Sequence, residues 1–140
     1  MPYDLERFLR PQDPIYAEVL QELRDGQKRG HWMWFIFPQL AGLGQSSTSR
    51  FFGIGSLTEA VAYAKHQILG TRLDECTALV NAITGRSIID IFGSIDAMKF
   101  HSSMTLFSRA VSDGPFRSAL EKYFAGELDQ MTLDLLAAAK

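Results

Sequence analysis

Polar side chains that could take part in chemistry lie inside or beside the most apolar parts of this sequence. His31 follows a glycine and begins the run HWMWF, so it stands where a polar loop meets an apolar segment. An imidazole in that position can serve as an acid–base group or donate to a ligand. The alternative is a structural hydrogen bond from the ring to the backbone.

A second set of polar residues, Asp96, Lys99 and Ser103, recurs at i, i+3 and i+7 in the expected helix 95–111. At this spacing the three side chains form one narrow strip. Apolar residues flank the strip on both sides: Ile95, Met98 and Leu106 on one, Phe100, Met104 and Phe107 on the other. We therefore expect a helix wedged inside the fold, with its strip forming a cleft wall. The alternative is an Asp96–Lys99 ion pair on a modest exposed strip.

Arg50 is the third candidate, because it is the one charged residue between positions 31 and 58. The flexible stretch Gly42-Leu43-Gly44 precedes it and could direct backbone N–H groups at an anion. A guanidinium suits phosphate or carboxylate. The loop lacks the pattern of a P-loop, and pairing of Arg50 with a helix C-terminus or a buried acid remains an equal alternative.

The sequence predicts neither a metal site nor a cofactor. The lone cysteine, Cys76, has aliphatic neighbours at helical spacing, which favours an inert, buried thiol. His31, His66 and His101 are about 35 residues apart, without the short spacing of metal ligands.

The 28 residues 31–58 contain six of the sixteen aromatic residues of the chain and a single charge, whereas residues 1–30 contain eleven charges. A charge-poor aromatic segment is either core, or the wall of a pocket, or a contact with a partner. All three interpretations stay open on sequence alone.

The composition limits the class of protein. With 140 residues, 46% of them apolar, we expect one domain over 1–140. A net charge of −2 argues against a nucleic-acid partner bound through bulk charge. The longest apolar run is too short for a membrane span, the N-terminus is too charged for a signal peptide, and one cysteine suits a reducing compartment. We expect a cytoplasmic protein without a membrane partner.

Apolar spacing and caps predict an all-α fold, a compact bundle of about six to eight short helices. Asp13 and Pro14 are typical of a helix start, Ser56 and Ser87 of capping boxes, and Gly70 of a helix break. Residues 32–37 are ambiguous between strand and helix, and 41–56 are expected to be a long loop. The expected helices are 4–9, 13–25, 56–69, 69–83, 87–93, 95–111, 115–124 and 127–139.

The run His31-Trp32-Met33-Trp34-Phe35-Ile36-Phe37-Pro38-Gln39-Leu40, followed by Gly42-Leu43-Gly44, resembles the signature of an uncharacterised family, domain of unknown function 1810. Residues 98–107 and 129–133 resemble the same family. The resemblance spans essentially the whole chain. It implies a small, all-helical, single-domain fold and no established activity.

These observations lead to a hypothesis with one alternative. The protein binds or hydrolyses a small anionic, nucleotide-like metabolite in a pocket built from segment 31–56 and the polar strip, with His31 or Asp96 as the acid–base group. The alternative is a non-catalytic protein-interaction or homo-oligomerisation domain, and the sequence leaves open whether the protein is an enzyme. The expected ligand-binding residues are Trp32, Trp34, Gln39, Gly44, Arg50, Lys99 and Ser103.

Overall fold

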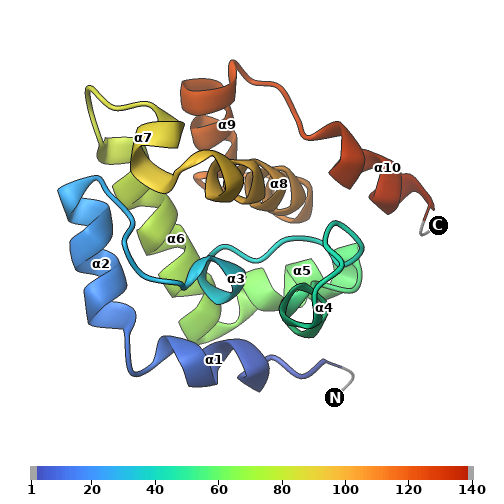
Figure 1. Cartoon of the computed structure of the whole chain (residues 1–140). Coiled ribbons are helices and arrows are strands. Elements are labelled where there is room, and N and C mark those ends of the chain that lie inside the picture. The colour runs from blue at the N-terminus through green and yellow to red at the C-terminus, as the bar shows by residue number, and fades with distance from the viewer. Residues whose placement is uncertain (1–2, 139–140) are drawn as a thin grey trace.

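The computed structural model describes residues 3–138 and confirms the all-α prediction (Figure 1). Within this range there are ten helices, and the only β-type pairing is an isolated bridge between Leu40 and Ile54. The helices are α1 Glu6–Gln12, α2 Tyr16–Asp25, α3 Met33–Ile36, α4 Ser47–Phe52, α5 Leu57–Lys65, α6 Gln67–Ala82, α7 Ile88–Phe92, α8 Ser94–Ala110, α9 Phe116–Phe124 and α10 Gln130–Ala138.

Helix α8 is the centre of the fold and packs against α5, α7, α9 and α10. Phe100, Met104 and Phe107 are fully buried on it, as the spacing predicts. The second predicted apolar face is wrong for Ile95 and Met98, which are 70% and 72% exposed. The segment before α10 crosses this side of α8 farther along the helix, where Asp129 is hydrogen-bonded to Ser102 and Thr105. The first turns of α8, which contain Ile95 and Met98, are therefore left uncovered.

The number of helices exceeds the expected range because α3 and α4 form where the sequence has no periodicity. The ambiguous segment 32–37 contains the short helix α3, and the expected loop 41–56 contains α4. Helix α4 begins where the hydroxyl of Ser46 accepts the Ser49 N–H. Two backbone bonds, from Ala41 N–H to the Ile54 carbonyl and from Ile54 N–H to the Gln39 carbonyl, close the loop that carries α4.

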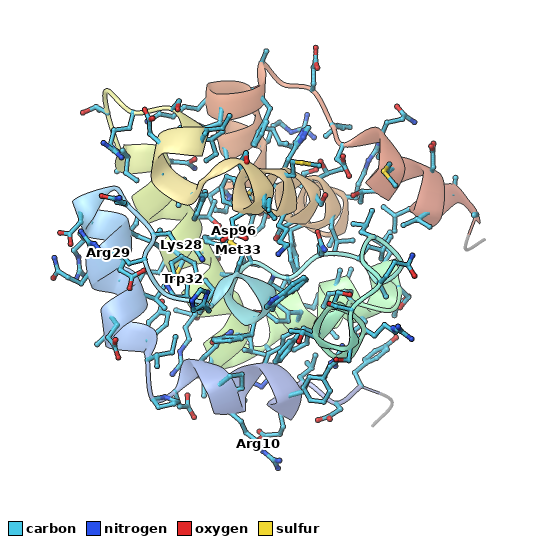
Figure 2. The ribbon with its side chains drawn as sticks, in the orientation of Figure 1. Arg10, Lys28, Arg29, Trp32, Met33 and Asp96 are labelled. Carbon is cyan, nitrogen blue, oxygen red and sulfur yellow. The ribbon has the colours of Figure 1, made fainter. Side chains whose placement is uncertain are left out.

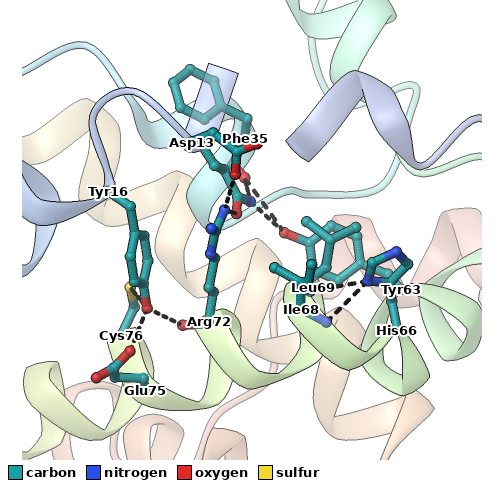
Figure 3. A network of polar contacts seen from close by, with 11 residues as sticks. Asp13, Tyr16, Phe35, Tyr63, His66, Ile68, Leu69, Arg72, Glu75 and Cys76 are labelled. Carbon is teal, nitrogen blue, oxygen red and sulfur yellow. Dashed lines mark hydrogen bonds and ion pairs between the residues drawn. The ribbon is translucent and has the colours of Figure 1, made fainter. Parts of the chain in front are cut away.

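Two predicted boundaries are wrong. Gly70 does not break a helix but lies inside α6, because the break falls four residues earlier at His66. The His66 Nδ1 atom caps α6 by accepting the N–H groups of Ile68 and Leu69 (Figure 3). Asp13 does not start α2 but ends α1, since its N–H donates to the Leu9 carbonyl.

A polar network buried between α1, α3, α5 and α6 holds these helices together (Figure 3). The side-chain amide of Gln12 donates to the Phe35 carbonyl at 2.6 Å and to the Tyr63 hydroxyl at 3.2 Å. Arg72 donates to the Gln12 side-chain oxygen and to the Asp13 carboxylate. A buried amide bonded on both its nitrogen and its oxygen avoids the cost of unpaired polar atoms.

Cys76 is buried in this region, and its side chain is expected to be unreactive. Burial raises the pKa of the Cys76 thiol to about 12, against a partial lowering by the bond to the Tyr16 hydroxyl. Only the thiolate reacts with disulfide reagents, so the folded protein should release no thionitrobenzoate from Ellman's reagent at pH 8, and the unfolded protein one equivalent. Rapid labelling of the folded protein would contradict this prediction.

Candidate functional site

The loop between α2 and α3 is held in shape by one carboxylate, that of Glu22. Its Oε1 atom accepts the N–H groups of Arg29 at 2.7 Å and Gly30 at 3.0 Å, and the indole N–H of Trp32 at 2.9 Å. Burial alone would raise the pKa of Glu22, but these three bonds outweigh it and hold the pKa below its ordinary value of 4.5. Glu22 thereby fixes where the loop directs Lys28 and His31.

This carboxylate predicts a pH dependence of stability. Because the pKa of Glu22 is lower in the folded than in the unfolded protein, its stabilisation is complete above the ordinary pKa and is lost as the pH falls through the folded pKa. We expect Glu22→Gln to be less stable than wild type at pH 7, with a gap that narrows below about pH 4. Urea unfolding between pH 3 and pH 7 measures the gap, and a gap independent of pH would contradict the prediction.

Lys28 reaches from this loop to the first turn of α8. Its backbone N–H donates to the Ile91 carbonyl at 2.8 Å, which ties the loop to α7. Its Nζ atom lies 2.7 Å from Asp96 Oδ2 and also donates to the Gly30 carbonyl. Figure 2 shows Lys28, Asp96, Trp32 and Met33 grouped at the middle of the molecule. The Lys28 side chain is only 8% exposed, so this ion pair is largely shielded from water.

Lys99 lies one turn along α8 from Asp96 and is placed differently. Its Nζ atom is 3.7 Å from the centre of the Trp34 ring, a cation–π contact, and 3.5 Å from Asp96 Oδ1. The side chain is 20% exposed, and within residues 3–138 its ammonium has no polar partner besides Asp96. An ammonium has three N–H donors, so this mostly buried group has room for acceptors that the described chain does not supply.

Together these residues enclose a small cavity of about 100 Å³, which we call the lysine cleft. Two lysines against one aspartate leave the cleft with an excess positive charge, and His31 stands exposed at its edge. His31 makes no side-chain hydrogen bond to residues 3–138, so both ring nitrogens are open to solvent or a ligand. The lining residues are Lys28, His31, Met33, Trp34, Asp96 and Lys99.

Comparison with known proteins identifies the family. The model for "Protein of unknown function (DUF1810)" matches residues 2–136. The chain belongs to the DUF1810 family. Within solved structures, this DUF1810 chain is similar to the conserved hypothetical protein Rv1873 from Mycobacterium tuberculosis: the two are 54% identical, with a TM-score of 0.96, over 98% of this chain and 99% of that one. No curated protein matches the chain. The family resemblance expected from sequence is thus confirmed, and neither finding carries an activity.

The structure brings four of the nine predicted site residues of this DUF1810 chain together. Segment 31–56 contributes His31 and Trp34 to the lysine cleft, and the polar strip of α8 contributes Asp96 and Lys99. Asp96 and Lys99 show a feature of each alternative for the strip, whereas its third residue, Ser103, is fully buried outside the cleft. Asp96 and Lys99 form an ion pair, and they also line a cleft.

The other five predicted residues lie elsewhere. Trp32 is 2% exposed, and its indole N–H donates to Glu22. Gly44 packs so closely on Ser49 that a Cβ atom on the glycine would lie 2.8 Å from the Ser49 side chain. Gln39 accepts from Ile54 through its backbone carbonyl. The remaining two are Arg50, whose guanidinium donates to the Gln45 carbonyl, and Ser103, whose fully buried hydroxyl has no partner within residues 3–138.

Lys28 is a residue of the cleft that the sequence did not predict. Lys28 lies 68 positions before its partner Asp96, and no helical period links residues in different elements. The one feature of the sequence that could have indicated Lys28 as a site residue is its position, three residues before His31.

From 3 to 138, no three His, Cys, Asp or Glu side chains are grouped so that they could hold a metal ion. None of the helices in that range has both the length and the apolar character needed to cross a bilayer.

Proposed function

We propose that this protein binds a small molecule through a phosphate or carboxylate group held in the lysine cleft. The observation that carries the proposal is Lys99, whose side chain is four-fifths buried and whose ammonium has a single ion-pair partner among residues 3–138, Asp96 Oδ1 at 3.5 Å. The Trp34 ring on one side and Asp96 on the other fix its position. A phosphate or carboxylate oxygen entering the cleft supplies a second acceptor to this ammonium and forms a charge-assisted bond.

The size of the cleft limits which part of a nucleotide-like ligand it can hold. Pockets that enclose a whole drug-sized ligand measure about 300–1,000 Å³. At about 100 Å³ the lysine cleft accommodates an anionic group but not the ring system of a nucleotide. Trp34 is the only tryptophan lining the cleft, and its ring already contacts Lys99. Recognition of the anion, with the rest of the ligand outside the cleft, therefore fits the geometry better than stacking of a base.

Thermal unfolding with added inorganic phosphate, AMP or adenosine tests the proposal. A ligand at 100 times its Kd stabilises the folded state by about 2.7 kcal/mol, so phosphate and AMP should raise the Tm of the wild type while adenosine does not. Lys99→Met should abolish the shift. Arg50→Met is the matched control, because it removes an exposed cation outside the cleft, and it should keep the full shift.

Either of two results would overturn binding in the cleft. One is an equal shift with adenosine and AMP, which places recognition on the nucleoside. The other is an unchanged phosphate shift in Lys99→Met, which places the anion elsewhere or makes the effect one of general salt.

Hydrolysis of the bound molecule is a further candidate activity, favoured by the position of His31. Both oxygens of Asp96 face lysines, at 2.7 Å and 3.5 Å, so Asp96 suits a positioning role. His31 lines the same cleft with unoccupied ring nitrogens and is the group placed to give a proton to a leaving group. Release of phosphate from AMP by the wild type, lost in His31→Gln with the AMP-induced Tm shift retained, would support hydrolysis. No release by the wild type would leave a binding protein.

A non-catalytic role as a homo-oligomer is the second candidate, and the exposed Ile95 and Met98 favour it. They are three positions apart on one face of α8, which places two exposed apolar side chains side by side, and contiguous exposed apolar surface is typical of contacts with a partner. Light scattering decides: a dimer that dissociates in the Ile95→Ser, Met98→Ser double variant supports the candidate, and a wild-type monomer rejects it. Both roles suit the cytoplasmic setting that the lone, buried thiol favours.

A further inference from the structure

Two hollows lie on either side of Arg109, near the C-terminal end of α8 and away from the lysine cleft. The larger measures about 610 Å³ and lies between the start of α5 and helix α10. The smaller measures about 390 Å³ and lies against α9. Arg109 lines both. In Figure 1 the linker from α9 passes over to α10 on this side of the fold.

The larger hollow has apolar walls. Leu57 is 39% exposed, and Leu133 and Leu136 are half-buried, so each offers uncovered hydrocarbon. Arg109 is the single charged residue in its lining. The volume falls in the range of about 300–1,000 Å³ typical of sites for small organic ligands. Its occupant should therefore be mainly apolar and carry one negative group.

The smaller hollow is more polar and shows where that negative group would lie. Arg109 and Arg117 both line it, together with Glu121, so the three charges leave a single excess positive charge. Neither arginine forms a hydrogen bond or an ion pair with any residue between 3 and 138. A guanidinium presents five N–H donors in a planar fork that matches a carboxylate.

We propose that this second site binds an amphipathic monoanion, an unbranched alkyl carboxylate. The carboxylate lies on Arg109, at the junction of the two hollows, with Arg117 beside it. The hydrocarbon chain lies between α5 and α10, against Leu57, Leu133 and Leu136. The site shares no residue with the lysine cleft, so this proposal does not depend on the function proposed above.

Calorimetric titration with hexanoate, octanoate and decanoate tests the apolar part of the site. Burial of each added methylene should tighten binding about fourfold. Leu57→Asn should reduce this increment, and it is a mild change because Leu57 is already 39% exposed. An affinity that does not change with chain length would overturn the proposal.

A second titration tests the head group with octanoate against octanol. Arg109→Gln should weaken octanoate about tenfold and leave octanol unchanged, since only the carboxylate uses the guanidinium. The matched control is Arg10→Gln on α1, which removes an arginine whose side chain is 82% exposed and which points away from the fold (Figure 2). It should bind octanoate as the wild type does. Equal losses in the two variants would mean a general charge effect and would overturn the assignment to Arg109. Lys99→Met should bind octanoate normally, which separates this site from the lysine cleft.

Discussion

Arg7→Met should lower the free energy of unfolding by about 3–5 kcal/mol, the cost of breaking a buried ion pair by removing one partner. The Arg7 guanidinium lies 2.9 Å from Glu59 Oε2, and the two side chains are only 11% and 7% exposed. Arg7 also donates to the carbonyls of Phe51 and Gly53, so it joins α1, the end of α4 and the start of α5. Methionine fills much of the same space but leaves the buried Glu59 charge without its cation; Glu59 Oε2 and two carbonyls lose their donor, and Oε1 keeps the Gly55 N–H.

Urea unfolding of matched variants measures this effect. Arg10→Met is the control on the same helix: Arg10 pairs with Glu6 at 3.8 Å, both side chains are more than half exposed, and the loss should stay below about 1 kcal/mol. The double variant Arg7→Met, Glu59→Met should be more stable than Arg7→Met, because it removes the unpaired charge. A loss within 1 kcal/mol for Arg7→Met would contradict the prediction.

The Arg7–Glu59 pair also illustrates what the sequence does not contain. Its partners are 52 positions apart, and Arg7 is one of eleven charges in the first thirty residues. Spacing along the chain predicts which side chains share a face of one helix, but not which helices meet. Elements with a clear apolar stripe or a cap, such as α8 or the capping box of Ser87 and Asp90 on α7, were therefore predictable. Helices α3 and α4 were not, since they contain only four and six residues and their shape depends on what packs around them.

The same distinction holds for the candidate site. The strip Asp96, Lys99, Ser103 was visible because it lies on one helix, and so was the unusual position of His31. The cleft still differs from the expected one, since Lys28 enters it from a loop and Arg50 does not line it. The aromatic residues of segment 31–58 divide between several environments: Trp32 and Phe37 are 2% and 1% exposed, Phe51 is 56% exposed, and Trp34 lines the lysine cleft. Composition showed that this segment is poor in charge, but only the fold decides which of its side chains are buried, face a cavity or face solvent.

Gly70→Ala should destabilise the protein, although the same change in an ordinary helix stabilises it by about 1 kcal/mol. Gly70 lies inside α6, where α5 ends against it, and a Cβ atom there would lie 2.1 Å from the Ala64 carbonyl oxygen and 2.9 Å from its carbon. Real Cβ atoms do not approach backbone atoms so closely, so α5 and α6 must move apart. We expect a net loss of about 1–3 kcal/mol, as for other overpacked sites.

A second substitution in α6 separates the clash from helix propensity. Ala78 is exposed in the same helix, so Ala78→Gly should cost about 1 kcal/mol and report the propensity difference alone. Because propensity favours alanine at both positions, a loss of stability in Gly70→Ala can come only from the contact with Ala64. Urea unfolding of the two variants measures both changes in the free energy of unfolding. A Gly70→Ala protein more stable than the wild type would contradict the prediction, because it would show that α5 and α6 move apart without loss of stability. The glycine that the sequence suggests as a helix break is, in this fold, the residue that lets α6 pack directly against the backbone of α5 at Ala64.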